Sequence, residues 1–287
     1  MLTLRRLSFA LLLLAANLAI TCPAQPPNTP AQPLTIEAVL ARVRANVAAY
    51  STSLPNFICD ESVDSRRTGG GKLKDEMKIE SSFSIVRQAD GISFREIRVK
   101  NLVNGSKPRN QKISPPYFFS GGIGNLIQLV DDKCAHFAFA PVAHPAGDAP
   151  VVITDTHGPA SPDMPVYCAR LRKHNYRAQI VIDPRTFQVL HIESSEQDVS
   201  FGLASHLPFV PVPSAQNILT VSVDYAPIAL GGKTFWLPQT VTSTVTDRKK
   251  PLTLEYAAHY SNYHRFATTS PILPAVKEAS NNPANPN

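Results

Sequence analysis

Two glycine-rich stretches of the sequence could contact a phosphate or another anion. Gly231-Gly232-Lys233 resembles part of a phosphate-binding loop, but that loop needs a further spaced glycine and a lysine that opens a helix. Here Lys233 is followed by Thr-Phe-Trp-Leu-Pro, which is typical of a strand, so the stretch predicts a tight turn between two strands. Gly121-Gly122-Ile123-Gly124 could offer N–H groups to an anion at a helix start. No strand–helix–strand unit surrounds it, and we interpret it as a flexible lead into a short helix.

The titratable side chains form no recognisable catalytic or metal-binding set. No histidine pair has the HExxH spacing of a zinc site, and no G-x-S-x-G marks a serine nucleophile. The carboxylate pairs Asp60-Glu61 and Asp75-Glu76 are adjacent, and neighbours in a strand point to opposite faces. We therefore predict no catalytic residue, no metal ligand and no cofactor, and we expect a protein that is not an enzyme. A site assembled from distant residues stays as an alternative.

The four cysteines include no CxxC motif, which argues against a zinc knuckle or a thioredoxin-type site. An oxidising compartment would permit one disulfide among Cys59, Cys134 and Cys168. Cys134 and Cys168 lie on strand-like segments that we expect to be neighbours, so we favour that pair and leave the two pairings of Cys59 open. A reactive thiol needs a basic neighbour. Acidic Asp60 and Glu61 follow Cys59, so we expect this cysteine to be buried and inert.

The N-terminus has the pattern of a secretory signal peptide. Two arginines precede an apolar run from Phe9 to Ile20, which is too short to span a bilayer. Small residues predict cleavage after Ala24, so residues 1–24 would be the signal peptide and the mature protein would be periplasmic or secreted, with no transmembrane segment. Lipid anchoring through Cys22 is the alternative, although the residues before Cys22 depart from the motif that lipidation needs.

Composition divides the rest of the chain into three parts. Residues 25–33 form a proline-rich spacer and residues 269–287 a tail, and we expect both to be disordered. Residues 34–268 are enough for a single sizeable β domain. The formal net charge of +6 falls to +4 without the two leader arginines, and the basic residues are scattered, so no nucleic-acid partner is predicted. We interpret the tightest basic cluster, Arg248-Lys249-Lys250, as a solubilising turn.

Hydrophobic periodicity predicts one N-terminal helix followed by antiparallel strands. Apolar positions at helical spacing and a capping Thr35 predict an amphipathic helix over residues 35–50, lying on a sheet. The period then changes to two, and tight turns at residues 68–71, Asp90-Gly91 and Asn104-Gly105 require antiparallel pairing. A change of phase between the apolar residues on either side predicts a β-bulge near Arg95-Glu96.

The remaining pattern predicts a long meander interrupted midway by a second, shorter helix. That helix covers residues 120–130, and a proline-rich loop covers residues 202–217. The predicted strands are residues 134–140, 150–156, 165–172, 176–183, 187–195, 218–226, 234–246 and 252–266. The fold class is therefore mainly β (α+β), an antiparallel β-sheet with an N-terminal amphipathic helix and a short mid-chain helix packed on it.

Four stretches carry a resemblance to a known group of proteins. They are LPNFICDESV (54–63), GGIGNLIQLV (121–130), YRAQIVIDPRTFQVLHIE (176–193) and VDYAPIALGGKTFWLP (223–238). With them, the chain resembles an uncharacterised family of secreted acidobacterial proteins, and its order of elements is similar to that of the lipoprotein carriers LolA and LolB and of RseB. The resemblance implies a curved half-barrel sheet with helices against its concave side. It carries over no catalytic residue.

Three functions follow as expectations. The first is a non-catalytic periplasmic or secreted binding or carrier protein for a lipid, a lipoprotein or another apolar ligand. The second is an envelope sensor that binds a protein partner, as in RseB, and the third is a secreted hydrolase of unknown substrate. The candidate cavity-lining side chains for the first are Phe83, Ile85, Phe94, Ile180, Ile182, Val189, Val223 and Trp236. The alternative is that these side chains only pack under the helix.

Overall fold

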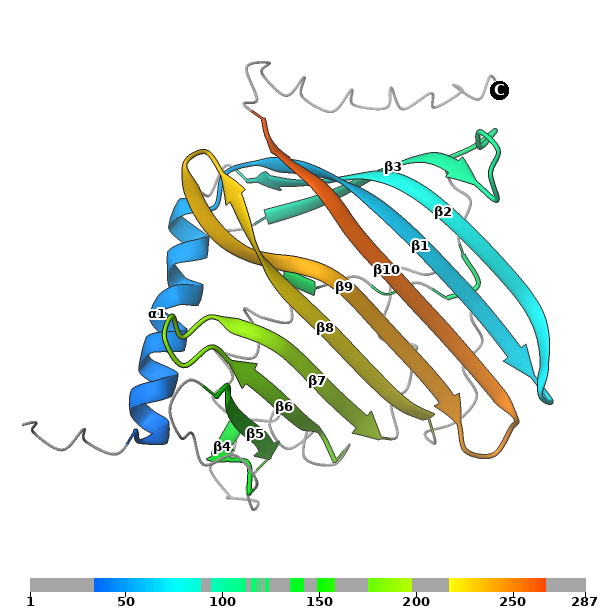
Figure 1. Ribbon diagram of the computed structural model, residues 1–287. Coiled ribbons are helices and arrows are strands. Elements are labelled where there is room, and N and C mark those ends of the chain that lie inside the picture. The colour runs from blue at the N-terminus through cyan, green and yellow to red at the C-terminus, as the bar shows by residue number, and fades with distance from the viewer. Residues whose placement is uncertain are drawn as a thin grey trace, which may run out of the picture. The chain divides into compact units, whose positions relative to one another are not determined.

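Figure 1 shows a computed structural model of the protein, in which one ten-stranded sheet dominates. The structure describes residues 34–88, 94–111, 115–117, 119, 122–123, 135–141, 149–157, 175–197 and 217–266. Met1–Leu34 and Thr35–Asn287 cluster as separate units, and the elements below belong to the second unit. No helix among the described residues is long and apolar enough to cross a lipid bilayer.

One helix, α1 (Ile36–Ser53), opens this unit. The Thr35 hydroxyl accepts a hydrogen bond from the backbone N–H of Ala38 at 3.2 Å, as expected for a capping residue. One stripe of the helix is buried, with side chains at a spacing of three or four residues. Its members are Val39, Val43, Val47 and Tyr50, and Leu54 continues it just after the helix. The amphipathic helix predicted over residues 35–50 is therefore confirmed.

All ten strands run antiparallel to their neighbours. They are β1 (Phe57–Gly69), β2 (Lys72–Arg87), β3 (Phe94–Val103), β4 (Ala135–Phe139), β5 (Val151–His157), β6 (Arg177–Ile182), β7 (Val189–Gln197), β8 (Asn217–Leu230), β9 (Lys233–Asp247) and β10 (Leu252–Arg265). Their order in the sheet is β3-β2-β1-β10-β9-β8-β7-β6-β5-β4, so the sheet stays open between edge strands β3 and β4. The predicted fold class, mainly β with an N-terminal helix, is confirmed.

Glycine turns join the long strands, as the sequence indicates. Gly231 and Gly232 have φ angles of 61° and 79° between β8 and β9, where most other residues would be strained. The interpretation of Gly231-Gly232-Lys233 as a turn rather than a phosphate loop is therefore confirmed. The strands predicted over residues 218–226, 234–246 and 252–266 correspond to β8, β9 and β10.

The predicted β-bulge near Arg95-Glu96 is wrong. Pairing between β2 and β3 is continuous there, from Arg87↔Phe94 to Ser81↔Lys100, and the register shifts only beyond Lys100. The apolar residues that suggested a slip, Ile97 and Val99, simply point outward and are 37% and 51% exposed.

Several predictions fall on residues outside those described. Among them are the disulfide between Cys134 and Cys168, the strand over residues 165–172 and most of the loop over residues 202–217. Of the mid-chain helix predicted over residues 120–130, the structure describes Gly122 and Ile123, which are helical.

One face of the sheet is buried along nearly every strand, and the sheet curves around it (Figure 1). We call this the concave face. From β5 to β9 it is mostly apolar, although buried Asp155 of β5 and Ser243 of β9 also lie on it. Its apolar side chains, all no more than 4% exposed, include Val151, Ile153, Ile180, Ile182, Val189, Ile192, Val221, Val223 and Val241. At β1, β2, β3 and β10 it becomes mixed, with charged and tyrosine side chains among the apolar ones.

Polar contacts hold α1 against two hairpins of the sheet. The Asn46 amide donates to the backbone oxygens of Thr186 and Phe187, both at 2.9 Å, in the turn between β6 and β7. The Tyr50 hydroxyl donates to Gln188 Oε1 and accepts from the backbone N–H of Trp236, each at 2.9 Å. Tyr50 therefore joins the helix to β9 and to the residue before β7 through one hydroxyl.

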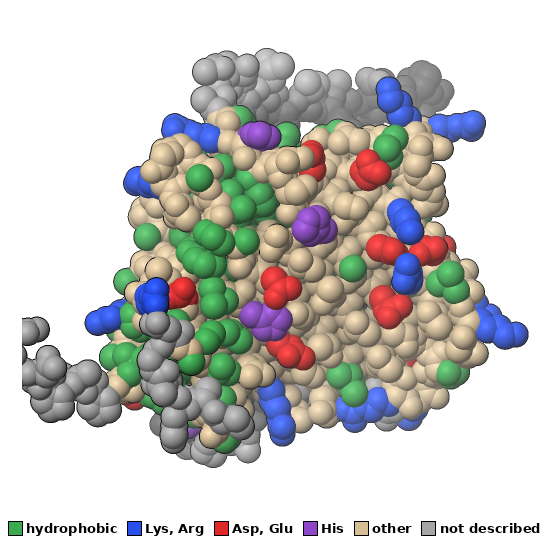
Figure 2. Space-filling view, viewed as in Figure 1, with side chains coloured by type: hydrophobic (Ala, Val, Ile, Leu, Met, Phe, Trp, Pro, Cys, Tyr) green, Lys and Arg blue, Asp and Glu red, His purple; other side chains and the backbone are tan. Residues whose placement is uncertain are grey.

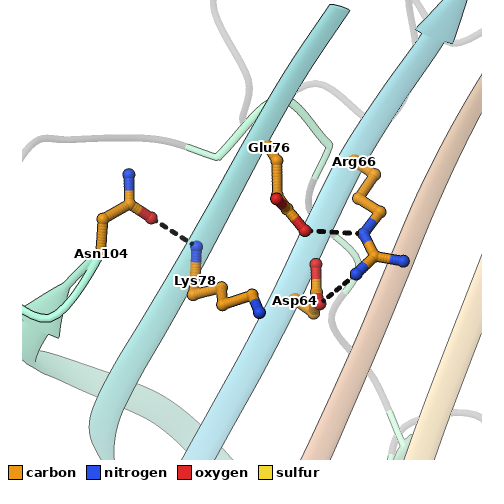
Figure 3. A network of polar contacts seen from close by, with 5 residues as sticks. All are labelled: Asp64, Arg66, Glu76, Lys78 and Asn104. Atoms are coloured by element: carbon orange, nitrogen blue, oxygen red, sulfur yellow. Dashed lines mark hydrogen bonds and ion pairs between the residues drawn. The ribbon is translucent and has the colours of Figure 1, made fainter. Parts of the chain in front are cut away.

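The outer face carries exposed charges. In one network, Arg66 of β1 contacts Asp64 and Glu76, both at 2.9 Å, and beside it Asn104 Oδ1 accepts from the Lys78 backbone N–H (Figure 3). Exposed pairs of this kind contribute little to stability. Figure 2 shows scattered Asp, Glu and His side chains over this part of the molecule.

We predict that Tyr50→Phe lowers the free energy of unfolding by about 1–2 kcal/mol, because the part-buried Trp236 N–H loses its acceptor. Urea denaturation measures the change. Thr52→Ala, at an exposed position of the same helix, is the control and should change the value by less than about 0.5 kcal/mol. Equal effects of the two substitutions would contradict the assigned role of the Tyr50 hydroxyl.

Candidate functional site

A buried ion pair lies on the concave face where β1, β2 and β3 meet. Strand β3 alternates so that Glu96, Arg98 and Lys100 point to this face. Arg98 Nε lies 2.9 Å from Glu61 Oε1 and 3.0 Å from Oε2, and Arg98 Nη1 lies 3.0 Å from Glu96 Oε2. The Glu61 side chain is 1% exposed and that of Arg98 is 16% exposed. Such a carboxylate is tolerated in a sheet interior only when a cation pairs with it.

Aromatic rings surround the guanidinium of Arg98. Its Cζ lies 4.4 Å from the centre of the Phe83 ring, in a cation–π contact. The Phe83 ring in turn lies 5.4 Å from that of Tyr260. The cluster therefore places a cation between two carboxylates and an aromatic wall, which fixes the direction in which the guanidinium points.

Burial and charge act in opposite directions on the cations of this cluster. Burial is the largest influence on the pKa of Arg98 and lowers it. The surrounding acidic groups, Glu61 first, together outweigh burial, so the pKa is raised above its ordinary value and the guanidinium stays protonated. For Lys100, burial and the neighbouring charge of Arg98 lower the pKa. Arg98 therefore stays positively charged between Glu61 and Glu96.

The tyrosines and the cysteine beside the ion pair remain protonated near neutral pH. Burial raises the pKa of Tyr256, Tyr260 and Tyr263 well above the usual value. Burial and, next, the charge of Glu61 raise the pKa of Cys59 to about 12. Cys59 is a buried free thiol, as the sequence predicted, and it lacks the thiolate character of a nucleophile.

A segment from the connection between β3 and β4 crosses the concave face over β1, β9 and β8. Ser65 Oγ donates to the Tyr117 carbonyl at 2.6 Å and accepts from its N–H at 2.9 Å. The Tyr117 hydroxyl lies 2.8 Å from Ser243 Oγ. Further along, the Tyr225 hydroxyl donates to the Gly122 carbonyl at 2.6 Å. Buried hydroxyls of the sheet thus bind the backbone of this crossing segment.

Gly122 lies so close to β9 that a side chain would not fit. A Cβ built there would be 2.9 Å from Pro238 Cγ and 3.0 Å from Val241 Cγ2. The glycine therefore allows close backbone approach rather than anion binding. Between this segment and the ion pair is a small pocket with room for about one water molecule. Its lining is Phe57, Phe83, Glu96, Arg98, Gly122, Ile123, Pro238, Tyr260 and Tyr263.

The candidate lining residues predicted from the sequence lie in different places. Ile180, Ile182, Val189 and Val223 lie together on the apolar part of the concave face, where Ile182 pairs with Val189. Three strands lie between β2 and β8 in the sheet, so four inter-strand spacings, or about 19 Å, separate them. These side chains therefore do not share one small pocket with those at the β2 end.

The other predicted lining residues lie at three further points. Phe83 lines the pocket and Ile85, on the same strand face, is buried. Half-buried Phe94 begins edge strand β3 and packs under the guanidinium of Arg87, 4.7 Å from its ring centre. Trp236 lies between buried Phe235 and Leu237 and projects to the opposite side of β9.

The sequence analysis did not identify Glu61 or Arg98 as site residues, although the alternation of buried residues in β1 pointed to Glu61. Glu61 shares the parity of the buried residues Phe57, Cys59 and Val63 in β1. A carboxylate in the inward phase of a strand requires a buried cation. The same logic applied to β3 would have identified Arg98 instead of the exposed Ile97 and Val99.

Elsewhere, His191 Nδ1 lies 2.7 Å from Asp224 Oδ1 in an exposed pair on neighbouring strands of the outer face. Within the described ranges, no group of three or more His, Cys, Asp or Glu side chains is placed to bind a metal ion. The concave-face cluster offers hydrogen bonds, a guanidinium paired with two carboxylates, and aromatic surface.

We predict that Glu61→Gln lowers the free energy of unfolding by about 3 kcal/mol, because it removes the main countercharge of a buried guanidinium. Replacing both partners, Glu61→Leu with Arg98→Met, should restore most of the loss. Urea denaturation measures both. The control Glu76→Gln, which breaks the exposed pair with Arg66, should leave stability almost unchanged. A Glu61→Gln effect no larger than that control would contradict a buried ion pair.

Alkaline pH should unfold the protein through its buried tyrosines. Burial raises the pKa of Tyr117 to about 12 from 10.0, although its bond to Ser243 lowers it somewhat. The unfolded state releases the proton first, so stability is intact below about pH 10 and falls as pH rises toward about 12. Near-ultraviolet tyrosinate absorbance should appear together with unfolding. Tyr117→Phe should reduce the slope of the free energy of unfolding against pH, between about pH 10 and 12, by the equivalent of about one proton. An unchanged slope would contradict the assignment.

No protein-family model matches the sequence, and no curated protein sequence matches it. Among solved structures, a DUF1329 family protein from Desulfovibrio piger is similar at 10% identity and a TM-score of 0.41, over 82% of this chain and 95% of that one. A LolA superfamily protein from Nitrosomonas europaea is similar at 10% identity and a TM-score of 0.32, over 82% and 94%. Likeness at these scores assigns no ligand or activity. The open antiparallel sheet with α1 is consistent with the LolA-like fold that the sequence resemblance implies.

Proposed function

We propose that this protein is a non-catalytic periplasmic or secreted binding protein that holds an apolar ligand, such as a lipid acyl chain, against the concave face. The observation that carries the proposal is the extent of the apolar surface there. One row of apolar side chains, Ile153–Ile180–Ile192–Val223–Val241, crosses five neighbouring strands, and buried Asp155 and Ser243 lie in the rows beside it. A face of this kind is what an acyl chain contacts in an apolar site.

The size of the face supports this proposal. Ten strands at about 4.8 Å spacing make a sheet on the order of 45 Å wide, whereas a helix is about 10 Å across. Helix α1 contributes one buried stripe and contacts the turn after β6 and the start of β9. One helix of this width spans only part of the concave face. The apolar side chains there are no more than 4% exposed, so a bound acyl chain would replace contacts that they already make.

The polar part of the face supports an amphiphilic ligand. Apolar side chains from β5 to β9 would hold the chain, and the Arg98 cluster with its tyrosine hydroxyls would lie near a polar group. The hydroxyl-bound crossing segment lies between the two parts, because Tyr117 is bonded to β1 and β9 and Gly122 to β8. An acyl lipid or lipoprotein has this division of polarity.

Edge strand β3 gives less support to the alternative of an envelope sensor that binds a protein partner. A protein partner that adds a strand needs free backbone groups on an edge. On β3, the Gln111 side chain accepts from the Lys100 N–H at 2.8 Å and donates to the Lys100 carbonyl at 2.9 Å. This side-chain amide takes the position that the backbone of an added strand would need. The hydrolase alternative has no convergent catalytic set to support it in the part of the chain described.

Native mass spectrometry and lipid extraction of the protein purified from expressing cells test the proposal. We expect a co-purifying acyl lipid, and we expect delipidated protein to bind a fluorescent fatty acid. A photoactivatable fatty acid should label peptides of β6 to β8. The heat-unfolded protein is the control and should lose selective labelling. Protein that carries no lipid and binds no fatty acid, or labelling confined to outer-face side chains, would refute the proposal.

A further inference from the structure

Two hairpin ends that are distant in the sequence meet at one end of the sheet. The turn from β1 to β2 and the turn from β9 to β10 lie side by side, because Gly69 pairs with Leu252. The Gly70 N–H also donates to the Pro251 carbonyl at 2.7 Å. Figure 1 shows both turns at the lower right end of the sheet.

These two turns gather basic side chains from separate parts of the chain. Lys72 and Lys74 come from the first turn, and Arg248-Lys249-Lys250 from the second, and all five are exposed. Together with Leu73 they are called the basic end here. Figure 2 shows Lys and Arg side chains along the lower and right margins of the molecule.

Nearby carboxylates leave this charge largely uncompensated. Asp247 Oδ1 accepts from the backbone N–H groups of Lys249 and Lys250, at 2.8 and 3.1 Å, and its negative charge offsets one of the five cations. Asp75 contacts Arg67 at 3.4 Å, which lies outside the basic end. The Arg248 side chain is held by the neutral Gln197 amide at 2.6 Å. The turn is therefore held in shape while its cations face solvent.

A large apolar side chain projects from the middle of these charges. Leu73, between Lys72 and Lys74, is 57% exposed, the highest value among the large hydrophobic side chains of the described chain. It lies at a hairpin end, where a strand begins and where nothing in the pairing of β1 with β2 requires an apolar residue.

We propose that the basic end docks on the surface of an anionic lipid bilayer, with Leu73 entering the interfacial region. The cations meet lipid phosphates, and each lysine or arginine near such a surface strengthens binding about five-fold at low salt. Leu73 adds the apolar contact that stabilises peripheral proteins at the boundary between headgroups and acyl chains. The two turns stand at one end of the molecule, so both can touch a flat surface together.

The exposed leucine distinguishes a bilayer from a dissolved polyanion. A nucleic acid or an acidic peptide attracts the five cations but gains little from an aliphatic side chain that stays in water. A bilayer gains from both. The interpretation of Arg248-Lys249-Lys250 as a solubilising turn rested on that segment alone, and the fold adds the two lysines and the leucine.

Co-sedimentation with vesicles tests the proposal, using protein from the soluble fraction of cells that express the full chain. We expect binding to vesicles of equal parts phosphatidylglycerol and phosphatidylcholine, weak binding to phosphatidylcholine alone, and loss of binding as salt rises. Lys72→Gln with Lys74→Gln should weaken binding about twenty-fold. Leu73→Ser should weaken it about ten-fold with all charges kept.

A matched control removes two cations from the opposite end of the sheet. Lys233 begins β9, whereas Asp247 ends it, about 45 Å away by strand length. Arg95 lies near the start of β3, opposite the β1–β2 turn. Lys233→Gln with Arg95→Gln should therefore leave vesicle binding unchanged within about two-fold. Circular dichroism melting confirms that each variant is folded.

Three results would overturn the proposal. One is an equal loss of binding in the control, which would mean that net charge alone acts. Another is a Leu73→Ser variant that binds like the parent, which would point to a dissolved polyanion. The third is no binding to anionic vesicles. The fatty-acid assay of the concave face uses no vesicles, so failure of membrane docking and failure of ligand binding are observed separately.

Discussion

Ten strands share one buried face, and this constraint governs the rest of the structure. Every strand must keep its inward side chains in phase with both neighbours. Register shifts within β1, β7 and β8 pairings absorb local irregularities without exposing the apolar set. Where a strand brings a charged residue inward, as Glu61 in β1, another strand within reach must supply the opposite charge, and Arg98 in β3 does so across β2. The candidate site is thus a product of the same pairing that forms the core.

The elements predicted well from the sequence are those in which the turn residues and the hydrophobic pattern indicate the same boundaries. Strands β8, β9 and β10 have mostly apolar side chains, many of them β-branched or aromatic, at alternate positions, with a glycine turn and a basic turn between them. Few other structures fit this pattern. Helix α1 has a capping residue and one apolar stripe. In both cases local propensity and tertiary burial favour the same structure.

The errors arose where tertiary context overrides hydrophobicity. In β3 the apolar side chains Ile97 and Val99 face outward and the charged ones face inward, where Arg98 reaches across β2 to Glu61 of β1. Whether a buried carboxylate on one strand meets a cation on another depends on the strand order β3-β2-β1. The alternation of residues within a single strand does not contain that order. For the same reason the adjacency of the β1–β2 and β9–β10 turns was not predicted from either turn alone.

The pairing of β1 with β10 has a consequence for how the chain folds. The first strand described lies beside the last one, in the interior of the sheet. During synthesis, β1 to β3 and β4 to β9 can pair with near neighbours, but β1 must wait for β10 before the two groups join. Closing so long a loop is slow. A nascent chain therefore keeps the β1 edge and its apolar side chains uncovered until nearly all of the sheet has emerged, and exposed edges of this kind are prone to aggregation.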